Sequence, residues 1–356
     1  MLIQLAVTGM IAALLPLAVV WVSSDTDKYR KLVWIMLFFT FDLIMFGAFT
    51  RLTDSGLGCP DWPGCYGQAN PLQAHADISA AEAAMPTGPV TVMKAWIEMI
   101  HRYLAMGIGV LIIAMMVIAW RRWLQSARRD MKFSPVFPTL LFGFVCLQGA
   151  FGAWTVTMKL QPVIVTTHLM LGMLLLALLT WAGARLSDHA PLPQEAAALR
   201  APAALAIVLL VAQIALGGWV STNYAALACL DFPLCQGALW PPMDFANGFT
   251  LWRNLGMTSK GEYLPFSALT AIHWTHRFFA FAVVALIAWV GIKALGIEGL
   301  RKTARWLLIM VALQFALGVS NVYLSLPLAL AVAHNGGAAL LLLLLVMLNY
   351  KIRSAT

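Results

Sequence analysis

The chain has 356 residues, of which 61% are hydrophobic and only 11% are charged. Soluble domains carry about 25% charged residues, so a soluble fold of this length could not bury so much apolar surface. The composition therefore excludes an ordinary soluble domain and predicts an integral membrane protein.

Nine apolar stretches are long enough to cross a bilayer, since a transmembrane helix needs about 20 residues. In chain order they cover residues 2–22, 31–50, 95–119, 134–156, 162–184, 202–222, 267–292, 303–324 and 328–350. The first has no basic segment before it and no small-residue cleavage site, so we interpret it as a helix and not as a signal peptide. The sequence thus predicts an all-α membrane protein with nine transmembrane helices.

The net charge of +8 is explained by membrane topology and does not indicate nucleic-acid binding. Most basic residues fall in alternate connecting segments, which hold Lys28, Arg30, Lys31, Arg121, Arg122, Arg128, Arg129, Lys132, Arg185, Arg200, Lys293, Arg301, Lys302, Arg305, Lys351 and Arg353. The positive-inside rule makes this side cytoplasmic. We therefore expect a multi-pass protein of the cell's inner (plasma) membrane, with the N-terminus outside and the C-terminus in the cytoplasm.

Four of the five cysteines then lie outside, as the pairs Cys59/Cys65 and Cys229/Cys235 in two proline-containing loops. Disulfides persist on the oxidising side of a membrane, so we predict the disulfides Cys59–Cys65 and Cys229–Cys235. A metal site is the alternative, although neither loop has a CxxC or a nearby CxxH. Cys146, inside a predicted helix, is expected to be a small packing residue.

The sequence is an internal duplication. Four landmarks recur in the same order, namely a cysteine pair, a helical His-Arg, a helical Gln and a helical His: Cys59/Cys65, His101-Arg102, Gln148 and His168, then Cys229/Cys235, His276-Arg277, Gln314 and His334. Both repeats begin on the same side of the membrane, which predicts two tandem parallel four-helix bundles related by a pseudo-two-fold axis along the membrane normal. We assign residues 1–30 to an extra N-terminal helix, 31–186 to the first repeat and 202–350 to the second.

The repeated histidines are the strongest indication of function. His75 and His189 fall in predicted loops and are expected to have no special role, whereas an ionisable residue inside a span is a functional hypothesis by default. The recurring four lie near the outer ends of their helices: His101, His168, His276 and His334. Cofactors bind between facing helices of four-helix bundles, and imidazoles are natural axial ligands of haem iron. We predict one haem between His101 and His168 and another between His276 and His334.

Two further residue types recur with the histidines. Arg102 and Arg277 each follow a histidine near the outer surface, and haem propionates would supply the anion that a buried guanidinium needs. Snorkelling to the lipid headgroups is the alternative. Gln148 and Gln314 lie well inside the membrane, where interhelical hydrogen bonding is the expected role.

The two repeats differ at one informative position. Glu98 lies one turn before His101 on the same helical face, and the matching residue in the second repeat is His273. A carboxylate beside only one site suggests that the two sites do different work. The alternative role for Glu98 is to orient His101, as carboxylates often do for metal-bound histidines. His273 could compete with His276 as a ligand, and the repeat alignment favours His276.

The motif order resembles the haem A synthase family. The run RLTDSGLGCPDWPGCYG after a membrane helix is followed by E-x-x-H-R, a helical histidine, a second loop with DFPLC, a second His-Arg and a last helical histidine. The resemblance covers about residues 31–350. It implies oxidation of the C8 methyl group of haem O to the formyl group of haem A, which haem–copper oxidases need.

The resemblance also implies roles for individual residues. The C-terminal half would hold a permanent haem b on His276 and His334, and the N-terminal half would bind the substrate haem O on His101 and His168. Glu98 matches the family's essential glutamate, which we expect to be catalytic, and the two cysteine pairs match its external pairs. Haem O synthase and oxidase assembly factors are the implied partners, and a homo-oligomer is compatible with the pattern. The first helix is additional to the family's usual eight.

A non-enzymatic diheme b-type membrane electron carrier is the main alternative function. It would need the same four ligands but no difference between the two sites, so the exchange of Glu98 for His273 argues against it. A haem transporter or assembly partner without chemistry is a third class.

Overall fold

The computed structural model describes residues 1–126 and 134–354, and over these residues it is helical without any β-strand. Nine described helices are long and apolar enough to cross a membrane: α1 (Leu2–Val22), α2 (Lys28–Leu52), α4 (Val92–Gln125), α5 (Val136–Thr157), α6 (Pro162–Arg185), α7 (Arg200–Thr222), α9 (Phe266–Leu295), α10 (Arg301–Tyr323) and α11 (Leu328–Ser354). Shorter elements are α3 (His75–Ala84), η2 (Gln194–Leu199), η3 (Ala225–Leu227) and α8 (Phe245–Gly248). The predicted all-α membrane fold is confirmed.

Three details of the sequence prediction need correction or qualification. His75 was expected in a loop but is the first residue of α3. Cys146 was expected to be a packing residue but is exposed on α5. The basic residues Arg128, Arg129 and Lys132, used for the topology prediction, lie outside the described residues.

The chain divides into two compact units. The first comprises Met1–Leu160 with Leu174–Ser187, and the second comprises Gln161–Met173 with Asp188–Thr356. Helix α6 therefore contributes its first half to the second unit and its second half to the first. The repeat boundaries 31–186 and 202–350 stay a prediction, because this division follows spatial proximity and not the sequence repeat.

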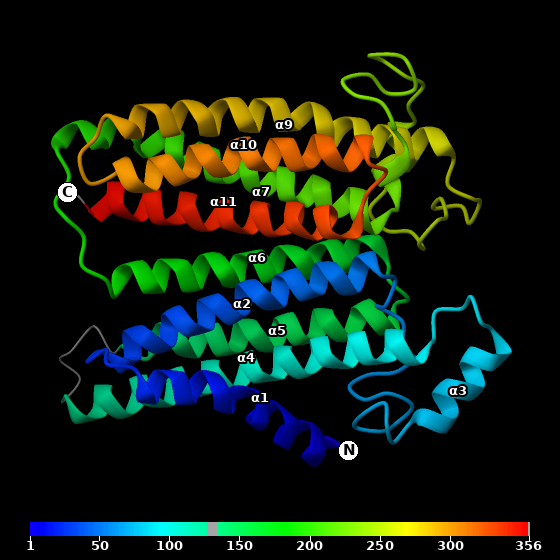
Figure 1. The fold of residues 1–356 in the computed structure, drawn as a ribbon, viewed down its shortest axis with the longest axis horizontal. Helices are drawn as coiled ribbons and strands as arrows, with labels where there is room; N and C mark the ends of the chain where they lie inside the picture. The colour runs from blue at the N-terminus through cyan, green and yellow to red at the C-terminus, as the bar shows by residue number, and fades with distance from the viewer. Residues whose placement is uncertain (127–133, 355–356) are drawn as a thin grey trace. The chain divides into compact units, whose positions relative to one another are not determined.

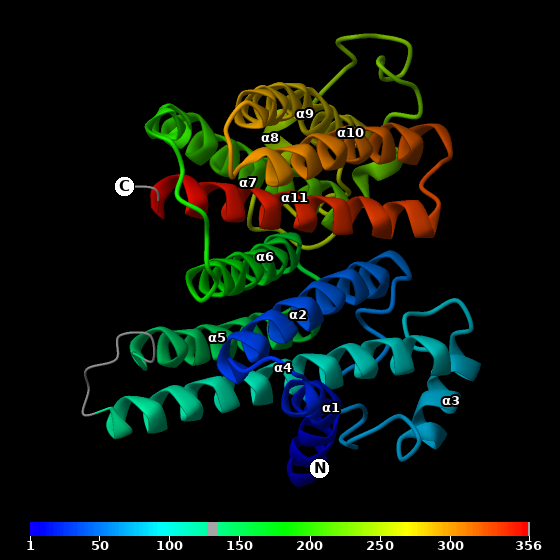
Figure 2. The same ribbon diagram turned by 60° about the vertical axis from the view of Figure 1, so that its left-hand side comes forward.

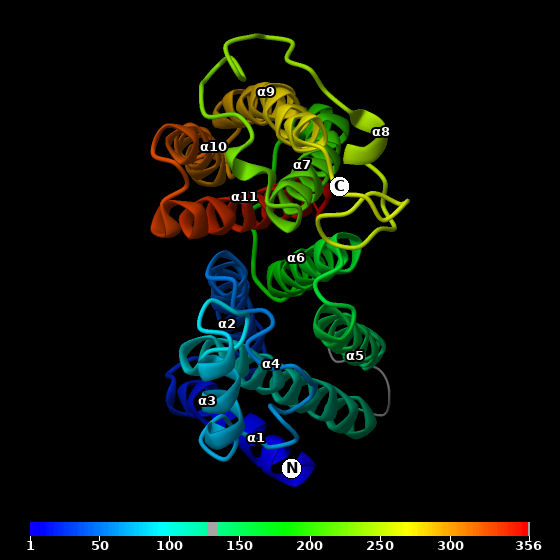
Figure 3. The same ribbon diagram turned by 90° about the vertical axis from the view of Figure 1, so that its right-hand side faces the viewer.

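In the second unit, four helices form a closed ring. Helix α7 packs against α9 and α11, and α10 packs against the same two helices (Figure 3). Consequently α9 and α11 lie diagonally across the bundle, and side chains from both can face its interior. Backbone polar groups are satisfied within each helix, as hydrocarbon surroundings require.

The first unit shows a related order of helices. Helix α4 packs against α2 and α5. In the second half of α6, Gly183 lies against the Trp34 ring of α2 and the Trp181 ring contacts Phe137 of α5. The second half of α6 therefore lies beside α2 and α5, although it packs less closely than α11 does against α7 and α10. Helix α1 crosses α4 (Figure 2).

Each unit carries a disulfide loop at the end where the first helix of its bundle ends and the next begins (Figure 1). Both loops turn in the same way: an aspartate carboxylate accepts hydrogen bonds from two successive backbone N–H groups, Asp61 from Tyr66 and Gly67, and Asp231 from Gln236 and Gly237. Desolvation raises the pKa of Asp231, but these N–H groups outweigh it and hold the pKa below its ordinary value. The local structure therefore repeats along with the sequence.

Candidate functional site

The first disulfide loop is fastened to α4 by Glu98 and Arg102, which lie one turn apart. Glu98 Oε2 accepts the Cys59 N–H at 2.8 Å, and Glu98 Oε1 lies 2.5 Å from Arg102 Nη2. Arg102 Nη1 also donates to the carbonyl oxygens of Asp61 and Gly64. The Glu98 and Arg102 side chains are only 5% and 9% exposed, so this is a buried and fully engaged ion pair.

Arg277 makes the equivalent contacts to the second loop without a carboxylate beside it. Its Nη2 donates to the carbonyl oxygens of Asp231 at 2.6 Å and Leu234 at 3.0 Å, and its guanidinium lies over the Phe232 ring. Because His273 replaces the carboxylate, the buried Nη1 of Arg277 has no hydrogen-bond partner among the described residues. Arg277 therefore keeps a donor for an external anion, whereas Arg102 is neutralised.

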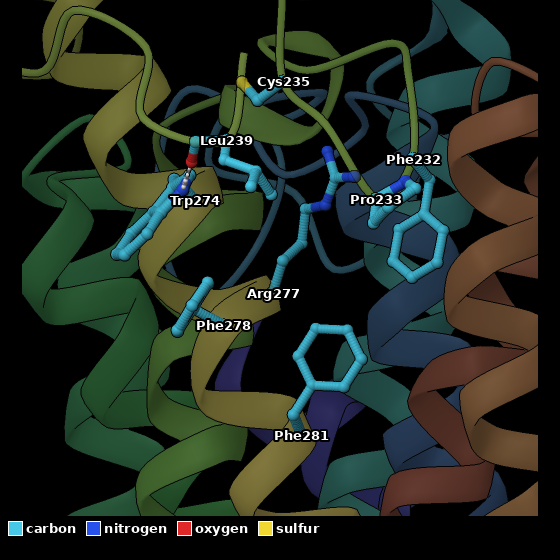
Figure 4. Close-up of a pocket in the computed structure, with 8 residues that line it drawn as sticks. All are labelled: Phe232, Pro233, Cys235, Leu239, Trp274, Arg277, Phe278 and Phe281. Carbon is cyan, nitrogen blue, oxygen red and sulfur yellow. Dashed lines mark hydrogen bonds between the residues drawn. The ribbon is translucent and has the colours of Figure 1, made fainter.

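A pocket of about 210 Å³ surrounds Arg277 beneath the second loop (Figure 4). In that view the Arg277 side chain extends from α9 towards the segment with Phe232 and Pro233. The lining is otherwise mostly aromatic and comprises Phe232, Pro233, Cys235, Leu239, Trp274, Arg277, Phe278 and Phe281. One cation among aromatic rings suits a carboxylate attached to a large apolar group.

His276 and His334 lie on the diagonal helices α9 and α11 of the second unit. Each imidazole lies against a glycine of a neighbouring helix. A Cβ added to Gly217 of α7 would lie 3.0 Å from His276 Cε1, and one added to Gly318 of α10 would lie 3.1 Å from His334 Cε1. Both rings therefore occupy space that a larger side chain would fill.

Each of these histidines also contacts a glutamine on the same neighbouring helix. Gln213 Nε2 lies 3.1 Å from His276 Nδ1 and donates to the His276 carbonyl oxygen at 3.0 Å. Gln314 Nε2 lies 3.4 Å from His334 Nε2 and donates to the His334 carbonyl oxygen at 2.9 Å. The interhelical role expected for Gln314 is confirmed by the latter bond.

In the first unit, His101 has a similar setting. A Cβ on Gly47 of α2 would lie 3.1 Å from His101 Nε2, and the Phe46 ring stacks on the imidazole with ring centroids 6.3 Å apart. His168 lies on the half of α6 that belongs to the second unit. The pairing of His101 with His168 therefore stays a prediction.

The cysteines form the disulfides Cys59–Cys65 and Cys229–Cys235. No group of three or more His, Cys, Asp or Glu residues within residues 1–126 and 134–354 could hold a metal ion by itself. In haem, the iron is held by a chelating porphyrin ring and the protein adds only axial ligands.

The interior of the second bundle fits such a ring by its chemistry. Buried polar atoms that lack a partner within the described chain gather on the residues around the two imidazoles: Gln213 Oε1, Gln314 Oε1 and His334 Nδ1. Leaving such atoms unpaired costs about 1–3 kcal/mol each, so a ligand with complementary polar groups would be stabilised here. Imidazoles on two diagonal helices and a nearby guanidinium donor without a partner in the described chain are groups that bind haem iron and haem propionates.

Sequence reasoning missed Gln213 and the helix glycines Gly47, Gly217 and Gly318. A signal was present, because Gln213 and Gly217 are four residues apart, as are Gln314 and Gly318. That spacing places both on one helical face. Without contacts, however, a glutamine and a glycine in an apolar helix do not reveal which neighbour they face.

Comparison with known proteins agrees with the motif order and the fold. The family model described as cytochrome oxidase assembly protein (COX15-CtaA) matches residues 30–346. The chain belongs to this family. A protein of Shewanella oneidensis named "Heme A synthase" is 40% identical over 326 residues, which cover 90% of this chain and 96% of that protein.

Two more distant relatives carry the same name. The protein of Bradyrhizobium diazoefficiens is 29% identical over 94% of both chains, and that of Methylobacterium radiotolerans is 31% identical over 82% of this chain and 81% of its own length. The family match together with the nine apolar helices makes the chain a multi-pass membrane protein of cytochrome oxidase assembly. The match covers 90% of this chain and 96% of its Shewanella relative, so the comparison concerns nearly the whole chain and not one half of it.

Proposed function

We propose that this protein is a haem A synthase, an oxidoreductase that converts the C8 methyl group of haem O into the formyl group of haem A. The observation that carries the proposal is the placement of His276 and His334 on diagonal helices of one bundle, each lying against a glycine of a neighbouring helix. The name shared by the relatives supports the reaction.

The second repeat would hold haem b between His276 and His334, with Arg277 as the propionate contact. The buried, unpartnered Nη1 of Arg277 supports that contact, since a charged donor left without an anion is costly. When bound, the haem supplies one-electron redox chemistry near the substrate half. The protein's part is to hold the two imidazoles in line and to neutralise the carboxylates.

The first repeat would bind the substrate haem O between His101 and His168. The contacts of α4 with α2 and α5, and of α6 residues with Trp34 and Phe137 of the same two helices, support a second four-helix arrangement in this half. The Gly47–His101 contact repeats the Gly217–His276 contact and supports His101 as a ligand.

Glu98 is the residue that we assign to proton transfer at the substrate site. Oxidation of a methyl group releases protons, and a buried carboxylate one turn from His101 is positioned to accept them. The same carboxylate accepts the Cys59 N–H and pairs with Arg102. Protonation of Glu98 would therefore weaken both contacts that hold the first disulfide loop to α4. The Arg102 guanidinium already pairs with Glu98. A contact of Arg102 with a propionate of the substrate would therefore be made alongside that ion pair.

The proposed location is the inner membrane, with the N-terminus and both disulfide loops outside and the C-terminus in the cytoplasm. Haem O synthase would supply the substrate, and oxidase assembly factors would receive the product. Both exchanges involve apolar molecules that stay in or at the bilayer, which fits a site formed by membrane helices.

The proposal is tested by expressing the full chain in a host that makes haem O but no haem A. Pyridine haemochrome analysis of the membranes should show haem A, and the variants His101→Ala and His276→Ala should not produce it. A diheme electron carrier would leave haem O unchanged while still showing bound b-type haem, and that result would overturn the proposed reaction.

The role of Glu98 is tested in the same host. We expect Glu98→Gln to lower the haem A yield by at least tenfold, because general acid–base groups contribute about 10²–10⁴-fold to rates. Glu82→Gln is the matched control, since Glu82 also accepts a backbone N–H within the first outer region, from Val92. A normal haem A yield from Glu98→Gln would remove its proposed role.

A further inference from the structure

Each proposed haem-b ligand contacts the same pair of residue types on a neighbouring helix. Gln213 and Gly217 of α7 face His276, and Gln314 and Gly318 of α10 face His334. In both pairs the glutamine precedes the glycine by four residues, which is one helical turn. The arrangement thus occurs twice in one bundle, on two helices that both border α9 and α11.

The glutamine and the glycine act on different parts of the histidine. The glutamine amide donates to the histidine's main-chain carbonyl oxygen and contacts the edge of its ring. The glycine leaves room for the ring, since a Cβ at Gly217 or Gly318 would come within about 3.0 or 3.1 Å of the imidazole. Together they restrict both the position of the helix and the rotation of the ring.

The glutamine carbonyl groups add a second constraint. Gln213 Oε1 and Gln314 Oε1 are buried without a hydrogen-bond partner in the described chain. Gln314 Oε1 lies directly against Gly337, one turn after His334, where any Cβ would overlap it. The atom that faces the His334 ring is the amide Nε2, and with Oε1 packed against the α11 backbone at Gly337 the Gln314 amide has no room to turn over.

We propose that Gln213 and Gln314, each with its paired glycine, are positioning residues that set the ring orientation of His276 and His334 and slow the loss of the haem between them. This inference rests on the proposed haem-b site. The sequence extends the pattern, because α5 carries Gln148 and Gly152 at the same spacing, where the repeat matches them to Gln314 and Gly318.

Helix α2 is the exception. Gly47 contacts His101 as Gly217 contacts His276, but the position four residues before Gly47 is Leu43. A leucine offers neither an amide donor nor an acceptor to the imidazole. The glutamine–glycine pair is therefore present beside both proposed ligands of the permanent haem. Beside His101, a proposed ligand of the substrate haem, the glutamine is missing. That haem must enter and leave in every turnover.

The test uses the purified full-length protein carrying its haem. Gln213→Leu and Gln314→Leu reproduce the residue found at position 43, and Gln213→Met keeps the length of the side chain in case the leucine variant does not accumulate. Val211→Leu, an exposed change on the same helix, is the control. The readouts are the largest g value of the ferric low-spin electron paramagnetic resonance signal, which reports the imidazole planes, and the rate of haem transfer to apomyoglobin.

We expect each glutamine variant to keep a low-spin spectrum but to shift its g value and to lose haem about threefold to tenfold faster, the loss expected for one hydrogen bond. Gly217→Ala should shift the same g value, because its Cβ displaces the ring. His276→Ala should abolish the low-spin signal. If it does not, the haem-b site itself is wrong. If His276→Ala abolishes the signal but the glutamine variants behave like Val211→Leu, the positioning role is overturned and the site stands.

Discussion

At the scale of single residues, one exchange separates the two halves of the molecule. Arg102 and Arg277 hold their loops through carbonyl oxygens of corresponding residues, but Glu98 accompanies only Arg102. A buried arginine with a carboxylate partner is neutral as a pair, whereas Arg277 retains a cationic donor without a partner in the described chain. The replacement of Glu98 by His273 thus frees one arginine to bind an anion and uses the other to hold a loop.

The two arginines should therefore respond differently to the same mutation. We expect Arg277→Gln to weaken retention of haem b about tenfold or more, because a charge-assisted hydrogen bond to a propionate is lost. Arg102→Gln should leave haem b in place and instead loosen the first loop. Haem content per chain after purification and the rate of proteolysis within residues 53–91 measure the two effects. Equal haem loss in both variants would contradict the assignment.

At the scale of helices, α2 and α7 occupy corresponding places but differ in one hydrogen-bonding side chain. Adding the missing amide with Leu43→Gln should strengthen the hold on His101. We expect the variant to be purified with more haem per chain than the wild type and to make haem A more slowly, because release of the product is hindered. The matched control is Leu43→Met, which adds length without an amide. An unchanged haem content with normal turnover would show that position 43 does not act on His101.

The number and type of the helices could be predicted from the sequence because spans in a bilayer are long, apolar and bounded by charge. The end of α4 was placed too early, at residue 119, because apolarity stops where Arg121 and Arg122 begin although the helix continues to Gln125. The face of α5 that carries Cys146 could not be predicted, since apolar residues suit both lipid and packed surfaces. Gln213 was missed for the same reason, as only its contact with His276 distinguishes it.

The sequence alone suggests the two histidine pairs, because a duplication makes a repeated position visible twice, and their role as ligands stays a prediction. His276 and His334 stand at positions that match His101 and His168 in the other repeat, so the repeat alignment alone picks out these four histidines. What the sequence could not give is the arrangement of partners around each ring. Gly217 and Gly318 lie on helices that precede their histidines, and such contacts depend on how the bundle closes.

At the scale of the whole molecule, each unit places its chemistry at the end that bears its disulfide loop. In the second unit, Arg277 and the pocket lie under the loop of Cys229–Cys235, and in the first unit Glu98 binds the loop of Cys59–Cys65. The parallel repeats that the sequence predicts would give this result, because corresponding loops would emerge on the same side of the membrane. Both proposed haems would then have their polar edges near one surface.

The membrane orientation follows from the same argument and is open to direct measurement. Alkaline phosphatase inserted at residue 70 or at residue 260 should be active, because that enzyme needs the oxidising exterior to form its disulfides. A green fluorescent protein fused after the last residue should fluoresce in the cytoplasm, where the basic residues Lys351 and Arg353 precede it. A phosphatase inserted near residue 190 should be inactive and serves as the internal control. The reversed pattern would place the disulfide loops in a reducing compartment, where they would not persist, and would overturn the proposed location of both sites.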